Sequence, residues 1–105
     1  MILTTIGQRT LLPRDVEIWF TRRGTNYYVV AETGESAQWV RNLRAEPRVR
    51  WKVGARLHSG RARILAPARD AMLSADVRAR SVAKYGWGDG LIVELRPGRA
   101  APAVC

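Results

Sequence analysis

A group of cationic side chains stands out between Arg48 and Arg63. Arginine can bind a phosphate or carboxylate group through two parallel hydrogen bonds, so clustered arginines suit an anionic ligand. If Gly54-Ala55 forms a two-residue hairpin turn, Arg48 lies opposite Arg61 and the two share a face of the sheet. That face then carries five cations: Arg48, Arg50, Lys52, Arg61 and Arg63. It is either a solvated outer surface or an anion-binding surface.

The whole chain is strongly basic. Its 105 residues include 18 Lys and Arg against nine Asp and Glu, which gives a net charge of +9. Such a balance favours polyanionic partners, namely nucleic acid, anionic lipid or a phosphorylated ligand. A codon bias toward arginine would explain why 16 of the 18 cations are Arg, but it would not explain the shortage of acids.

Several kinds of catalytic site are disfavoured by composition. His58 and Cys105 are the only histidine and cysteine, so a zinc site and a histidine-dependent triad are not expected. The sequence contains no phosphate-binding glycine motif, and its acids show no paired arrangement. If the protein is an enzyme, a bound cofactor is therefore expected to carry the chemistry. The single cysteine favours the cytoplasm, and no apolar run is long enough to span a membrane.

Local patterns predict an α+β domain in which the strands are mainly antiparallel. Six strands are expected over residues 2–6, 14–22, 27–32, 48–53, 57–65 and 91–95. A first helix should be capped by Ser36 and end before Pro47, and a second should run from Asp70 to Tyr85 and close at Gly86. The inner stripe of the second helix is expected to be Met72, Ala75, Ala79, Val82 and Ala83. We expect a single domain over residues 1–97 and a loose tail over 98–105.

Three segments resemble the deazaflavin-dependent nitroreductase family. They are Leu3-Thr-Thr-Ile-Gly-Gln-Arg-Thr-Leu-Leu-Pro-Arg14, Trp39-Val-Arg-Asn-Leu-Arg-Ala-Glu-Pro-Arg-Val49 and Lys84-Tyr-Gly-Trp-Gly-Asp-Gly-Leu-Ile-Val-Glu-Leu95. The resemblance implies a split β-barrel of about six strands with two surface helices, similar to pyridoxamine-phosphate oxidase. It also implies coenzyme F420, a deazaflavin with a phosphate and a polyglutamate tail, although FMN occurs in relatives. The implied reaction is hydride transfer to a small organic electron acceptor.

The resemblance also implies which residues would bind the cofactor. The phosphate and tail of the cofactor fall on the opening loop, the loop before the first helix and the start of that helix approach the cofactor, and residues of the helix support this wall. The implied positions are Gly7, Arg9, Thr10, Arg14, Glu32, Thr33, Gly34, Trp39 and Asn42. Tyr85 and Trp87 either line a substrate pocket or pack in the core or at an interface. The sequence departs from the family at Gln8, where a basic residue is usual, and at Leu11, where glycine is usual.

The sequence therefore favours an F420-dependent oxidoreductase with a cofactor cleft shared between the subunits of a homodimer, and it identifies no catalytic residue. One alternative is an FMN-binding or non-catalytic cofactor-binding split barrel. Another is a nucleic-acid-binding module that uses the basic hairpin, although no recognition motif supports it. A membrane partner is not expected.

Overall fold

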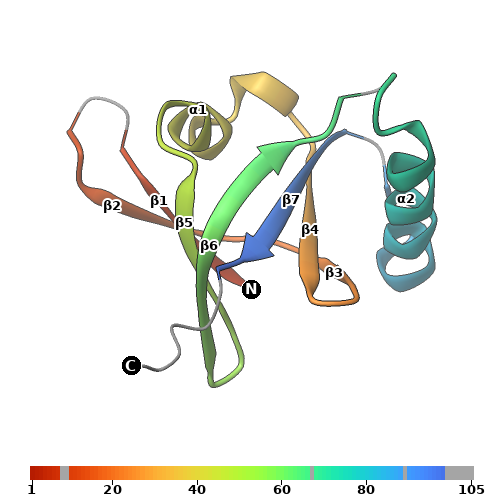
Figure 1. The fold of residues 1–105 in the computed structure, drawn as a ribbon, viewed down its shortest axis with the longest axis horizontal. Helices are drawn as coiled ribbons and strands as arrows, with labels where there is room; N and C mark the ends of the chain where they lie inside the picture. The colour runs from red at the N-terminus through yellow and green to blue at the C-terminus, as the bar shows by residue number, and fades with distance from the viewer. Residues whose placement is uncertain (8–9, 67, 89, 99–105) are drawn as a thin grey trace.

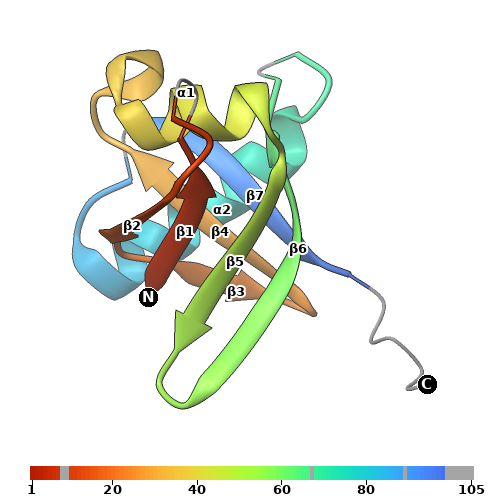
Figure 2. The ribbon, with the colours of Figure 1, turned by 90° about the vertical axis from the view of Figure 1, so that its left-hand side faces the viewer.

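The computed structural model describes residues 1–7, 10–66, 68–88 and 90–98. Within them, one curled sheet of seven strands has the order β2-β1-β5-β6-β7-β4-β3, and every neighbouring pair is antiparallel (Figures 1 and 2). The strands are β1 (Ile2–Ile6), β2 (Pro13–Glu17), β3 (Thr21–Arg23), β4 (Asn26–Ala31), β5 (Arg48–Val53), β6 (Arg56–Ile64) and β7 (Leu91–Pro97). The helices are η1 (Gly34–Ser36), α1 (Gln38–Ala45) and α2 (Ala71–Tyr85). The prediction of an α+β split barrel with two helices is confirmed.

The hairpin of β5 and β6 has the predicted register. Val53 pairs with Arg56 across the Gly54-Ala55 turn, and Arg48 pairs with Arg61. Gly54 has φ +58°, a left-handed conformation that glycine adopts without steric cost. The turn residues therefore set the pairing of the whole hairpin.

The predicted strand over residues 14–22 is wrong, because the chain changes partner within it. β2 pairs with β1 at one edge of the sheet, whereas β3 pairs with β4 at the opposite edge. Between them, the Ile18 amide donates to the Met1 carbonyl oxygen. Alternation of apolar residues reports which side chains face inward, but it does not report which strand supplies the hydrogen bonds. The sheet consequently has seven strands instead of six.

The sheet encloses the larger part of the core on its concave face. Leu3 and Trp51 are fully buried there, and Leu43 of α1 packs against the same cluster. α1 begins after Ala37, and Ser36 is not its cap, because the Ser36 hydroxyl donates to the Thr33 carbonyl oxygen 2.7 Å away. The serine serves the short η1 turn, so the predicted cap is wrong.

α2 covers the outer face of the sheet on the side of β4 and β7 (Figure 1). Leu73 and Val77 pack toward the sheet in a second core cluster with Tyr28. The predicted inner stripe is wrong, since Met72 is 90% exposed and Val82 is 52% exposed. Small and polar residues occupy several sides of this helix, so the spacing of its apolar residues does not identify a single buried face.

The helix still begins and ends where the sequence indicates. Asp70 occupies the N-cap position, and Gly86, with φ +75°, ends the helix in the left-handed conformation. The Asp70 carboxylate does not bond to the first turn of the helix. It accepts a hydrogen bond from the Ala66 amide at 2.8 Å instead. Neither described α-helix is long and apolar enough to cross a membrane.

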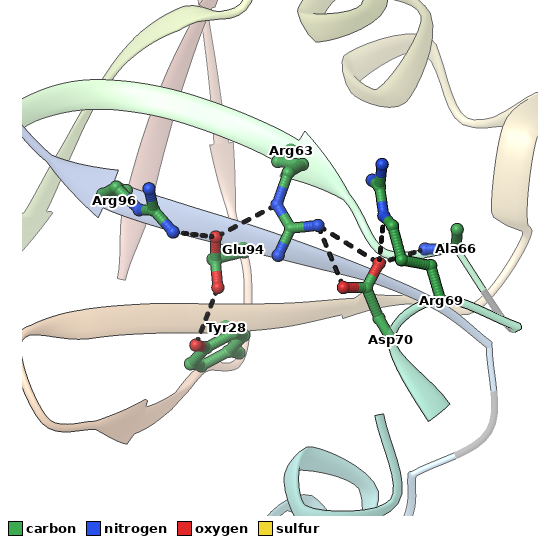
Figure 3. Close-up of polar contacts among 7 residues, drawn as sticks. All are labelled: Tyr28, Arg63, Ala66, Arg69, Asp70, Glu94 and Arg96. Carbon is green, nitrogen blue, oxygen red and sulfur yellow. Dashed lines mark hydrogen bonds and ion pairs between the residues drawn. The ribbon is translucent and has the colours of Figure 1, made fainter. Parts of the chain in front are cut away.

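A polar network beneath α2 joins the helix start to the sheet (Figure 3). Arg63 donates to both carboxylate oxygens of Asp70, at 3.0 and 3.1 Å, and its Nε donates to Glu94 at 3.3 Å. The buried Glu94 also accepts hydrogen bonds from the Tyr28 hydroxyl at 2.9 Å and from Arg96 at 3.4 Å. Burial, followed by the contact with Glu94, raises the pKa of Tyr28. Arg63 is thus an anchoring residue and not a free cation of the hairpin face.

Candidate cofactor site

A pocket of about 480 Å³ opens where the segment between β2 and β3 meets the end of β4, the start of α1 and the turn after α2. Its lining combines an aromatic wall with two carboxylates and aliphatic side chains. The lining residues are Glu17, Ile18, Trp19, Val30, Ala31, Glu32, Trp39, Tyr85 and Trp87. Its size is that of small-molecule sites in proteins, which typically hold about 300–1,000 Å³.

Trp19 and Tyr85 form a stacked pair in this wall. Their ring centroids lie 4.6 Å apart, and their planes differ by 11°. The Tyr85 hydroxyl donates to the Phe20 carbonyl oxygen at 2.9 Å and accepts from the Phe20 amide at 3.2 Å, which fixes the tyrosine ring. Trp19 remains 58% exposed, so a flat apolar surface faces the opening.

The turn after α2 holds Trp87 in the same wall. The Trp87 carbonyl oxygen accepts a hydrogen bond from the Ser81 hydroxyl at 2.5 Å, and the Gly88 carbonyl oxygen accepts one from Arg78 at 2.7 Å. A Cβ at Gly88 would lie 2.9 Å from the Arg78 carbonyl oxygen, so this close approach to the helix requires glycine. Two side chains of α2 therefore fix the backbone that presents Trp87.

Asn42 fixes α1, the element that places Trp39 in the pocket. The Asn42 side chain is buried, and it donates to the Thr5 hydroxyl at 3.1 Å and accepts from Gln38 at 2.9 Å. These bonds tie the helix to β1. Asn42 thus supports the wall of the site, whereas the half-buried Trp39 lines the pocket directly.

The opening loop closes on itself. The Gly7 amide donates to the Leu12 carbonyl oxygen at 2.8 Å, and the Leu11 amide donates to the Gly7 carbonyl oxygen at 2.9 Å. The Thr10 hydroxyl accepts from the Leu12 amide at 3.3 Å. These amides already have acceptors, so among the described residues of this segment the exposed Arg14, in β2, is the cation that could meet an anion. Arg9 and Gln8 lie outside the described residues.

Leu11 has a backbone conformation that glycine adopts more readily than leucine. It has φ +59°, the only positive φ among the described non-glycine residues. This left-handed conformation costs an L-residue about 1–2 kcal/mol. The chain therefore keeps the loop conformation that suits glycine while it carries a side chain that is 74% exposed.

The remaining predicted positions precede α1. Glu32 lines the pocket, the Thr33 carbonyl oxygen receives the Ser36 hydroxyl, and Gly34 has φ +61°. The structure thus brings Glu32 and Trp39 together in one pocket. Gly7, Thr10 and Arg14 do not line it.

Sequence reasoning missed Glu17, Ile18 and Trp19 as lining residues. They lie where the predicted strand over residues 14–22 breaks, at the end of β2 and between β2 and β3. A tryptophan close to charged residues in sequence was the signal available, since large aromatic surfaces are usually covered. For Tyr85 and Trp87 the sequence left open a place in a pocket lining or a place in the packed core or an interface, and both line the pocket.

The curled sheet and its helices define a split barrel of the pyridoxamine-phosphate-oxidase type. A candidate pyridoxamine 5'-phosphate oxidase from Listeria innocua superposes with a TM-score of 0.73 at 15% identity, covering 93% of this chain and 82% of that one. HutZ, a haem storage protein from Vibrio cholerae, gives a TM-score of 0.72 at 18% identity, with coverages of 94% and 81%. These likenesses establish the fold.

A family model described as F420H(2)-dependent quinone reductase matches residues 1–89, and the chain belongs to this family. An F420-H2 dependent reductase, FDR-A, superposes with a TM-score of 0.65 at 22% identity, covering 90% of this chain and 91% of that one. A search of curated proteins found no significant match.

Proposed function

We propose that the protein is a reductase that uses F420H2 to reduce a small organic acceptor such as a quinone. Family membership supports the cofactor class. The structural observation that carries the proposal is the aromatic pocket, in which Trp39 shares a lining with the stacked pair of Trp19 and Tyr85. A planar ring system and a planar acceptor are the ligands that such walls favour.

The charges of the site fit the two parts of the cofactor differently. Glu17 and Glu32 line the pocket, so the acidic phosphate and glutamate tail would be repelled there, whereas an uncharged ring would not. We assign the ring to Trp39 and its aromatic neighbours. The anionic part is assigned to the segment that contains Gly7, Arg9, Thr10 and Arg14.

When bound, F420H2 would supply the hydride, and the protein would supply position and surroundings. The aromatic side chains would orient the ring and exclude water from the reacting face. Tyr85 is held by two bonds to the backbone of Phe20, so its hydroxyl proton is engaged within the protein. We assign no proton donor.

The proposal is tested by titrating purified protein with F420 and with FMN while tryptophan fluorescence is followed, and then by measuring F420H2 oxidation by menadione. We expect saturable F420 binding and menadione-dependent oxidation. Trp19→Ala should weaken F420 binding about tenfold, because one stacked aromatic contact is lost. Leu57→Ala, at an exposed apolar residue outside the pocket, should leave it unchanged.

The other outcomes each contradict a part of the proposal. Preferential binding of FMN would replace the cofactor, and F420 binding without oxidation of F420H2 by menadione or other quinones would make the protein a carrier. Equal F420 affinity in wild type and Trp19→Ala would remove the aromatic pocket as the binding site.

We further propose that two chains associate. β2 is an edge strand, and exposed apolar side chains lie on or near it, including Ile2, Leu12 and Trp19. Pairing would bury this surface, which a small domain has few other means to cover. Light scattering should give twice the mass of the chain, and a monomer at all concentrations would reject the dimer.

A further inference from the structure

Three arginines stand side by side on adjacent strands of the outer face. Arg48 of β5 pairs with Arg61 of β6, and Arg61 pairs with Arg96 of β7. We call these three residues the arginine row. Neighbouring strands lie about 4.8 Å apart, so the row extends over about 10 Å. All three side chains are exposed, and like charges that face each other across a sheet repel.

The ends of the arginine row each form an ion pair, whereas Arg61 at its centre only attracts Glu46 at longer range. Arg48 pairs with Glu46 at 2.7 Å, and Arg96 pairs with Glu94 at 3.4 Å. Hydrogen bonds from Arg48 lower the pKa of Glu46 to about 2, so this carboxylate is fully charged near neutral pH. Among the described residues, no carboxylate forms an ion pair with Arg61.

A shallow groove of about 620 Å³ lies over the arginine row. Arg50 and Ser59 extend the lining by one further cross-strand pair. Gly60 also lines the groove, and a Cβ there would collide with the carbonyl oxygen of Arg96, so the close approach of β6 to β7 at this point requires glycine. The groove shares no lining residue with the aromatic pocket of the candidate cofactor site.

The chemistry of the groove selects among anions. A terminal phosphate carries more negative charge and one more oxygen than a carboxylate, so it suits a row of neighbouring guanidinium groups better than a single carboxylate does. The described lining contains no aromatic side chain on which a base could stack, which disfavours single-stranded nucleic acid. The run of cations along β6 on this face is also short, because Ser59 and Leu57 take the two positions that precede Arg61 on this face.

We propose that the arginine row binds a short linear polyphosphate, either as an inorganic chain or as the phosphate part of a nucleotide. Arg61 is its central ligand, because it faces a cation on each side and forms no ion pair with a described carboxylate. Arg48 and Arg96 contact the flanking phosphates and keep their carboxylate partners. The groove shares no lining residue with the aromatic pocket assigned to the F420 ring, so the proposal does not depend on whether the protein uses that cofactor.

The test is calorimetric titration of the F420-free protein with tripolyphosphate at low and at high NaCl concentration. We expect one saturable site whose affinity falls with salt. Arg61→Gln should bind about tenfold more weakly, because it removes charge-assisted hydrogen bonds. Arg56→Gln is the matched control, since it removes the same charge from the same strand outside the groove, and its affinity should match that of wild type. Circular dichroism of each variant establishes that it is folded.

Competing ligands identify the source of the phosphate and can overturn the proposal. Displacement of tripolyphosphate by ADP supports a nucleotide, and failure of ADP to displace it supports the inorganic chain. An equal loss of affinity in Arg61→Gln and Arg56→Gln would show general charge attraction and overturn the site. Tighter binding of a triglutamate peptide would overturn the choice of phosphate, and tighter binding of a DNA oligonucleotide would overturn the choice of a short chain.

Discussion

Two cross-strand rows on the outer face of the sheet carry arginine in opposite circumstances. In one, Arg63 of β6 lies opposite Glu94 of β7, and Asp70 accepts hydrogen bonds from the same guanidinium group. In the other, two residues earlier on β6, Arg61 faces Arg96 on one side and Arg48 on the other. The first row satisfies its cation within the fold, and the second leaves a cation for something outside it.

The comparison shows that residue type does not separate anchoring cations from binding cations. Arg61 and Arg63 are two residues apart on β6, so their side chains lie on the same face of the sheet. What differs is the residue that β7 places opposite each of them, Arg96 or Glu94. The functional value of an arginine here is decided by its cross-strand partner, and substitutions at the two positions should have opposite effects.

Arg63→Gln is expected to give the largest effect. It would leave the carboxylates of Glu94 and Asp70, which are 3% and 11% exposed, without their shared cation. Breaking a buried pair costs about 3–5 kcal/mol, and because Arg63 is itself 37% exposed we expect a loss of about 2–3 kcal/mol. Urea unfolding measures it. A loss no greater than that in Arg56→Gln would mean that the network does not anchor α2.

Acid should weaken the first row in a defined direction. The Ala66 amide and then Arg63 lower the pKa of Asp70 below its ordinary value of 3.8. A carboxylate whose pKa is lower in the folded state stabilises the fold above its unfolded pKa, and this stabilisation is lost as the pH falls through the folded pKa. The urea concentration at the unfolding midpoint of wild type should therefore decrease once the pH falls below about 4. In Arg63→Gln the drop should be smaller, and identical pH profiles would contradict the contribution of Arg63.

Arg61→Gln should move stability the other way. Removing the central cation relieves two like-charge contacts, so we expect a gain of up to about 1 kcal/mol at low ionic strength. Because exposed charges are screened, the gain should disappear in concentrated salt. Thermal unfolding at the two salt concentrations measures this. Destabilisation at low salt would mean that Arg61 already has a partner inside the fold.

Leu11→Gly provides a comparison of smaller size that involves no charge. Relief of the left-handed leucine would gain about 1–2 kcal/mol, and the added freedom of glycine in the unfolded chain would cost about 0.5–1 kcal/mol. The net gain should be roughly 0.5 kcal/mol and independent of salt. Thermal unfolding measures it, and a salt-dependent gain would undermine the electrostatic interpretation of Arg61→Gln.

The parts of the fold that depend on neighbours in sequence were predicted well. The Gly54-Ala55 turn set the register that places Arg48 opposite Arg61, and Gly86 ended α2 as expected. The partner change between β2 and β3 was not predicted, because one alternating run served two sheet edges. The buried face of α2 was also missed, since an alanine-rich helix carries little periodic signal.

Only part of the pocket lining was anticipated from the sequence, because some of its residues meet only in the folded chain. The resemblance supplied Glu32 and Trp39, which line the pocket, and Asn42, which holds the helix behind it. Trp19 was missed as a lining residue because it joins the pocket by stacking on Tyr85, far away in the sequence. Such contacts leave no mark on local patterns.

The sequence by itself determined the Gly54-Ala55 hairpin, the end of α2, the family and the excess of positive charge, because each of these depends on composition or on residues close along the chain. Only the tertiary structure decided which arginines are satisfied. Arg96 belongs to the last strand, and it lies beside Arg61 because β6 pairs with β7, although α2 separates the two strands in sequence. Charge–charge interactions depend on distance in space, and that distance is fixed only when the sheet has formed.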